Sequence, residues 1–244
     1  SMRLLDWWEQ ELQRCYHDTP SHPVMIALQQ TIHQHALPIE PLADLLSAFR
    51  QDQVVNRYQT EAQLLDYCRR SANPVGRILL HLAGVSHDDG WAFLLSDKIC
   101  SGLQLTNFCQ DMSRDAASDR IYVPEEFYSR HAVTESMILQ RRATPELRSL
   151  LAEWTIRSHQ FFVDGKPLVD LVPRWLRTDI DLFVRGGQAI LNRIEACGFD
   201  VWSARPSLSK WTKLRILLAS LLANHGRGRR AWIDAAQTEV PSHG

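Results

Sequence analysis

Four polar residues lie in one short segment at spacings of three, four and four, which on a helix would form one stripe: Gln104, Asn107, Asp111 and Asp115. Two carboxylates one turn apart repel each other, and a hard divalent cation removes that penalty. Magnesium is commonly held by one or two protein carboxylates together with waters and substrate phosphates. Carboxamides one and two turns earlier can bond a phosphate oxygen or a metal-bound water. The stripe therefore predicts a site for magnesium and a phosphate group.

The same spacing has a simpler interpretation, because a D-x-x-x-D pattern on a helix is commonly a solvated face. The surrounding segment weakens that alternative, since its other positions are rich in apolar residues and predict a largely buried helix. These apolar residues are Ile99, Leu103, Leu105, Cys109 and Met112. Spacing alone does not decide between the two interpretations.

The composition is that of an ordinary soluble globular protein. The 244 residues are 45% hydrophobic and 23% charged, and the formal net charge is −1. This balance gives no whole-molecule attraction to nucleic acid, so we expect no nucleic-acid partner. Five scattered cysteines without a C-x-x-C pair favour reduced thiols in a cytoplasmic protein. The longest apolar run, residues 216–223, is far shorter than the roughly 20 residues that span a bilayer.

Apolar residues recur at helical spacing along nearly the whole chain. Strand alternation, internal repeats, a Walker loop and G-x-G-x-x-G are all absent from the sequence. We therefore expect one all-α domain over residues 1–244, a helical bundle around a central cavity. The expected helices cover residues 4–16, 24–35, 40–52, 61–82 with a kink at Asn73-Pro74, 96–118, 145–165, 168–197 and 208–224, with a short basic segment at 225–230.

Longer motifs resemble the squalene/phytoene synthase family. Q-L-T-N-F-C-Q-D-M-S-R-D at 104–115, with D-R-I-Y-V-P at 119–124, is similar to the family's second aspartate-rich motif and its R-x-Y-x-P exit. R-Y-Q-T at 57–60 and Y-C-R-R-S-A-N-P-V-G at 67–76 match two further family elements. The S-A-N-P-V-G form resembles the hopanoid-pathway branch, whose members make hydroxysqualene or squalene from presqualene diphosphate. Residues 186–210 fit the family's C-terminal helices, so the likeness covers nearly the whole chain.

This resemblance implies an isoprenoid-synthase fold and a magnesium-dependent reaction on an isoprenoid diphosphate. It makes Asp111 and Asp115 metal ligands, and it implies two further groups of site residues. The diphosphate would be bound by Arg57, Gln104, Asn107 and Arg120. Catalysis would involve Tyr58, Tyr67 and Tyr122, with the Tyr67 phenol facing the reacting carbons to stabilise a cation or relay a proton. The cation would be captured by water or by hydride; NADPH as a hydride source has no supporting motif here.

Two departures from the family pattern bear on activity. The family's first aspartate-rich motif is absent from residues 1–18, so we expect the fold without the early helix that carries it, in an N-terminally incomplete chain. Gln110 stands where the family commonly has arginine. Two alternatives to action on presqualene diphosphate stay open: a head-to-head prenyl transferase making squalene, presqualene diphosphate or phytoene, and a catalytically inert helical scaffold. A lipid product would favour loose peripheral association of this cytoplasmic protein with a membrane, and the sequence leaves the oligomeric state open.

Overall fold

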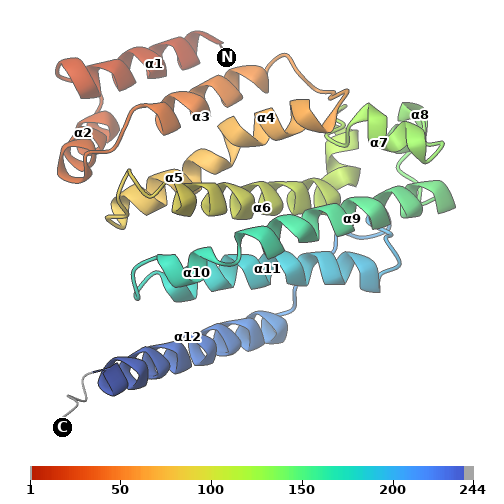
Figure 1. The fold of residues 1–244 in the computed structure, drawn as a ribbon. Coiled ribbons are helices and arrows are strands. Elements are labelled where there is room, and N and C mark those ends of the chain that lie inside the picture. Colours follow the sequence, from red (N-terminus) through yellow and green to blue (C-terminus); the bar gives the residue numbers. More distant parts are fainter. Residues whose placement is uncertain (1, 239–244) are drawn as a thin grey trace.

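The chain forms an all-α bundle. The computed structural model describes residues 2–238, with side chains described as far as Asn224. Over that part there is no strand, and a single bridge pairs Arg57 with Ile121. None of the helices in this part is both long and apolar enough to cross a membrane. The helices are α1 (Met2–His17), α2 (Pro23–His35), α3 (Glu40–Gln51), α4 (Glu61–Ser71), α5 (Asn73–Leu82), α6 (Gly90–Ala117), α7 (Glu125–Arg130), α8 (Glu135–Leu139), α9 (Pro145–Gly165), α10 (Leu168–Leu171), α11 (Arg177–Ala196) and α12 (Lys210–Thr238) (Figure 1).

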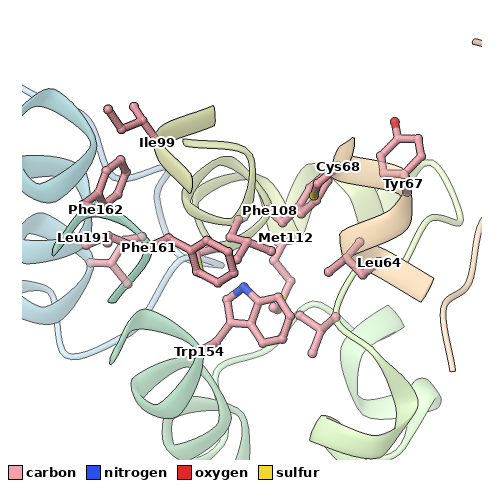
Figure 2. Close-up of a cluster of buried hydrophobic side chains, with 14 of the residues drawn as sticks. Leu64, Tyr67, Cys68, Ile99, Phe108, Met112, Trp154, Phe161, Phe162 and Leu191 are labelled. Carbon is pink, nitrogen blue, oxygen red and sulfur yellow. The ribbon is translucent and has the colours of Figure 1, made fainter. Parts of the chain in front are cut away.

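Helix α6 is the centre of the bundle. It is 28 residues long and packs against α5 on one side and against α9 and α11 on the other (Figure 1). Figure 2 shows Phe108 and Met112 of α6 in a cluster with Leu64 of α4 and Trp154 of α9. Leu64 and Trp154 are fully buried. The prediction that this segment is a largely buried helix is confirmed.

The two adjacent glycines of α11 have different surroundings. A Cβ added at Gly187 would lie 2.2 Å from the ring of Phe162, whereas one added at Gly186 would meet nothing within 4 Å. Gly187 therefore permits the close approach of α11 to α9, and Gly186 is not required for packing there. A glycine also permits close packing at the end of α9, since a Cβ at Gly165 would lie 2.6 Å from Ile99 of α6.

Most of the expected helices are confirmed, and three boundaries were wrong. The helix expected over 168–197 is divided into α10 and α11, because Pro173 in the intervening segment has no backbone N–H to continue the ladder. The last helix does not end at residue 224 but continues to Thr238 through the expected basic segment, whose side chains lie outside the described part. Helix α6 also begins earlier, at Gly90, where the side chain of Asp89 accepts a 3.1 Å hydrogen bond from the Ala92 N–H and caps the first turn.

Candidate active site

The polar stripe predicted from the sequence lies on α6. Asn107 is exposed, while Gln104, Asp111 and Asp115 are partly buried. The stripe therefore lies at the boundary between the core and the solvent. Among the described residues, no group of three or more histidine, cysteine or acidic side chains is placed to hold a metal ion. The chain thus offers two carboxylates and an adjacent carboxamide. Such a donor set suits magnesium, which completes its shell with waters and substrate phosphates.

Asp111 is paired with an arginine from the far end of the chain. Arg205, between α11 and α12, donates from Nε to Oδ1 at 2.6 Å and from Nη2 to Oδ2 at 2.8 Å. Arg114 adds a looser contact, 3.5 Å from Oδ1. The hydrogen bonds and charge of Arg205 hold the pKa of Asp111 below its ordinary value. Asp111 is therefore ionised at neutral pH and is already paired with a cationic side chain, that of Arg205.

Asp115 has the opposite environment. Its side chain makes no hydrogen bond or ion pair within the part of the chain that the structure describes. Burial, together with the nearby charge of Asp111, raises the pKa of Asp115 to about 6, and Arg120 offsets part of that effect. A partly buried carboxylate without a partner is the kind of group that a divalent cation would satisfy, so the two aspartates fit the implied magnesium.

The three predicted tyrosines meet beside this stripe. The rings of Tyr58, Tyr67 and Tyr122 have centroids 5.6–6.0 Å apart, and Tyr122 stacks on Phe108 of α6 at 4.0 Å. Figure 2 shows Tyr67 and Phe108 projecting from α4 and α6 in the same part of the core. Their meeting depends on the bridge of Arg57 with Ile121, which brings the chain before α4 alongside the chain after α6. Residues far apart in the sequence thus form one aromatic cluster.

Polar groups orient the hydroxyls of these tyrosines. Tyr67 donates to Asp52 at 2.8 Å, and Arg120 donates to the Tyr122 hydroxyl at 3.1 Å and to the Asp52 carbonyl at 2.9 Å. Gln51 donates to the Tyr58 hydroxyl at 3.2 Å. Burial, reinforced by Asp52, raises the pKa of Tyr67 well above its ordinary value, so the phenol stays protonated. Asp52 was missed as a site residue, because nothing in its own neighbourhood of the sequence indicates a tyrosine partner.

Arg57 lies outside this arrangement. Its guanidinium donates to Glu135 of α8 at 2.6 and 2.8 Å and to the carboxylate of Asp119 at 2.6 Å. These ion pairs join the chain before α4 to the α6–α7 connection and to α8. Binding of a diphosphate by Arg57 would require release from both carboxylates, and that role stays a prediction. Diphosphate binding by Gln104, Asn107 and Arg120, which lie on or beside the stripe, also stays a prediction.

An apolar groove reaches Asp52, the hydrogen-bond partner of Tyr67. It has a volume of about 520 Å³, lies between α1, α2 and α3, and is lined mainly by aliphatic side chains. Trp8 and Phe49 contribute aromatic surface, and Asp52 lies at its boundary. Because Asp52 also accepts the Tyr67 hydrogen bond, it connects the groove to the aromatic cluster. A second, much smaller cavity is lined by Phe108, Asp115 and Tyr122.

The helical fold, the acidic stripe and the aromatic cluster together define an all-α protein of the isoprenoid-synthase type. The family model described as squalene/phytoene synthase matches residues 1–212, and the chain belongs to that family. The resemblance identified from the sequence motifs is therefore confirmed.

Individual relatives show how much of the chain this likeness covers. A phytoene synthase from Arthrospira platensis is 28% identical over 235 residues, covering 91% of this chain and 76% of that protein. A hydroxysqualene synthase from Rhodopseudomonas palustris is 33% identical over 150 residues, covering 61% of this chain and 50% of that protein. The crystal structure of squalene synthase HpnC from Alicyclobacillus acidocaldarius is 40% identical, with a TM-score of 0.79, covering 82% of this chain and 75% of that one. This chain thus spans half to three quarters of these relatives.

Proposed function

We propose that this protein is a magnesium-dependent synthase that converts presqualene diphosphate to hydroxysqualene or squalene. The observation that carries the proposal is the position of Asp111 and Asp115, one turn apart on α6 and beside three clustered tyrosines. The similarity to a hydroxysqualene synthase and to a solved squalene synthase supports this substrate. The proposed pathway context is hopanoid or related triterpenoid synthesis.

The proposed reaction has two requirements, binding of the diphosphate and stabilisation of the carbocation, and different side chains would meet each one. Asp111 and Asp115 would hold magnesium, which when bound neutralises charge that develops on the diphosphate leaving group. Asn107 and Gln104 would donate amide N–H groups to phosphate oxygens or to metal-bound water. Arg120, fixed by Tyr122 and Asp52, adds a positive charge at the same end of α6. These residues bind and orient the leaving group.

The aromatic cluster and the groove would act on the hydrocarbon. The ring faces of Tyr58, Tyr67 and Tyr122 can stabilise a carbocation formed when the diphosphate departs. Apolar walls limit the access of water, so that capture of the cation is controlled. The groove between α1, α2 and α3 would hold an isoprenoid tail whose reacting end lies near Asp52 and Tyr67. Tyr67, bonded to Asp52, is the proposed group for moving a proton.

A second activity has its own support. The similarity to a phytoene synthase over 91% of this chain favours a head-to-head condensation of two prenyl diphosphates as the alternative. Incubation of the full chain with magnesium and, in separate samples, presqualene diphosphate, farnesyl diphosphate or geranylgeranyl diphosphate, followed by mass spectrometry of the extracted lipids, separates the two. We expect hydroxysqualene or squalene from presqualene diphosphate without added NADPH or with it, respectively. Presqualene diphosphate or phytoene formed from shorter prenyl diphosphates, with presqualene diphosphate left intact, would contradict the proposal.

The possibility of an inert scaffold is tested by ligand-dependent stabilisation of the same protein. A protein that binds magnesium together with a diphosphate is stabilised by that binding, whereas a scaffold without the site is not. We therefore expect the melting temperature to rise when magnesium and inorganic pyrophosphate are added together. No turnover and no rise would favour the scaffold.

A further inference from the structure

The connection between α11 and α12 is fastened to α6 by a buried glutamine. The Gln110 side chain is on the buried side of α6, with 8% of the residue exposed. Its Nε2 donates to the Pro206 carbonyl, and its Oε1 accepts a 2.9 Å hydrogen bond from Arg205 Nη2. Both ends of the carboxamide are therefore used to fix two consecutive residues of this connection. The result is a defined position for the Arg205 guanidinium.

That position is on the metal-binding edge of Asp111. The guanidinium contacts both carboxylate oxygens, at 2.6 and 2.8 Å, in the two-pronged geometry that arginine and carboxylate favour. The Asp111 side chain is 15% exposed and that of Arg205 is 35% exposed, so solvent only partly screens the pair. A divalent ion bound to the same oxygens would meet a fixed positive charge at its own position. The guanidinium and the ion would therefore compete for these oxygens.

We propose that Arg205, positioned by Gln110, is a tethered counter-cation for Asp111 that a divalent ion must displace on entering the site. The inference rests on the proposed function, because it takes Asp111 as a metal ligand. Two consequences follow. The metal affinity of the chain is set in part by competition with Arg205, and metal binding removes the Arg205–Asp111 contact that helps to hold the α11–α12 connection on α6, while the Gln110–Pro206 hydrogen bond remains. Gln110 is then a positioning residue, acting through Arg205 and not on the metal itself.

The chain contains a matched control for this idea. Arg148 of α9 donates to Asp200 at 3.1 Å and to the Gly198 carbonyl, so it holds the same connection without contacting Asp111. Replacing Arg148 loosens the connection and leaves the counter-cation in place. Arg205→Lys provides a second comparison, because lysine keeps the charge but cannot form the two-pronged contact.

Titration of the full chain with Mn²⁺ alone, followed by the electron paramagnetic resonance signal of the free ion, tests the competition. We expect Arg205→Gln to bind Mn²⁺ about three- to tenfold more tightly than wild type, as loss of a partly exposed ion pair implies. Arg205→Lys should lie between the two, Gln110→Leu should move in the direction of Arg205→Gln, and Arg148→Gln should stay within about twofold of wild type. Amide hydrogen exchange of residues 198–209 should speed up on Mn²⁺ addition in wild type and stay unchanged in Arg205→Gln.

The Asp111→Asn/Asp115→Asn double variant distinguishes failure of the counter-cation role of Arg205 from failure of the proposed function. If it abolishes Mn²⁺ binding while Arg205→Gln binds no more tightly than wild type, the counter-cation role is overturned and the proposed function stands. If the double variant binds Mn²⁺ as wild type does, the metal does not bind on α6 and both proposals fall. Circular dichroism of each variant confirms that an affinity change is not loss of the fold.

Discussion

The phenol of Tyr67 donates a 2.8 Å hydrogen bond to the carboxylate of Asp52, 15 residues earlier in the chain. This bond joins α4 to the end of α3, where Asp52 also lines the apolar groove. Only 4% of Tyr67 is exposed, so its hydroxyl depends on Asp52 for a partner. The contact fixes the direction of the Tyr67 phenol toward the Asp52 carboxylate.

Tyr67→Phe removes that hydroxyl and keeps the ring. We expect turnover to fall about 10²-fold, the lower range for loss of a group that transfers a proton. The free energy of unfolding should fall by about 1–2 kcal/mol, because Asp52 loses a buried donor. Tyr128→Phe on α7 is the control, since that phenol lies outside the cluster. Steady-state kinetics and urea unfolding measure both effects, and wild-type turnover in Tyr67→Phe would make Tyr67 a core residue only.

The pKa of Asp115 predicts a pH dependence with a definite sign. Its pKa is raised from 3.8 to about 6 in the folded chain, so between these values the folded state binds more protons than the unfolded state. The contribution of this group to stability therefore increases as pH falls from about 6 to about 4. Metal binding requires the ionised carboxylate, so Mn²⁺ affinity should weaken over the same range.

Asp115→Asn is the matching variant for this pH effect. Urea unfolding of wild type and Asp115→Asn at about pH 4 to 7 gives the difference in unfolding free energy between the two proteins. This range covers the ordinary and the raised pKa of the Asp115 carboxyl, 3.8 and about 6. We expect that difference to change with pH in favour of wild type as the solution becomes more acidic. A difference that is flat with pH would show that Asp115 titrates normally.

Arg57 can be tested for a structural and a ligand-binding role separately. Arg57→Gln loses ion pairs with Glu135 and Asp119, and both partners are substantially exposed, so we expect a loss of only about 1 kcal/mol in unfolding free energy. Glu135→Gln should cost a similar amount, yet it removes one of the two carboxylates that hold the guanidinium and leaves the pair with Asp119 in place. Calorimetry with inorganic pyrophosphate and magnesium should show weaker binding for Arg57→Gln and retained binding for Glu135→Gln. Equal binding by both variants and wild type would assign Arg57 a structural role alone.

The glycine pair of α11 gives a test of the packing. Gly187→Ala should destabilise the fold by about 1–3 kcal/mol, because the new methyl group would overlap the fully buried ring of Phe162. Gly186→Ala should stabilise it by roughly 0.5–1 kcal/mol, since alanine favours the helix and space is open there. Urea unfolding of the two variants should therefore move in opposite directions. Equal losses would indicate that the helix backbone, not the Phe162 contact, controls both positions.

Features with a local period were predictable from the sequence. The stripe on α6 follows from spacings of three and four, and the break between α4 and α5 follows from Asn73-Pro74. The meeting of Tyr58, Tyr67 and Tyr122 came from the family resemblance, because no local pattern places residues from three segments in one cluster.

Contacts between distant segments were not predictable in this way. Arg205 lies 94 residues from Asp111, and its basic neighbourhood resembles any solvated helix start. Gln110 was notable only as a departure from the family's arginine, yet in the folded chain it orients Arg205. Arg50 pairs with Asp6 and Glu9 of α1, more than 40 residues earlier in the chain, and not with its sequence neighbour Asp52. Such partners are decided by packing between helices.

The most direct test of the magnesium site compares pyrophosphate release from presqualene diphosphate by three proteins. These are wild type, the Asp111→Asn/Asp115→Asn double variant, and a control, Asp97→Asn. Asp97 lies elsewhere on α6, and its replacement breaks an ion pair with Arg77 of α5. We predict magnesium-dependent release by wild type and by Asp97→Asn, and a fall on the order of 10³-fold in the double variant. Release by the double variant at the wild-type rate would contradict the account.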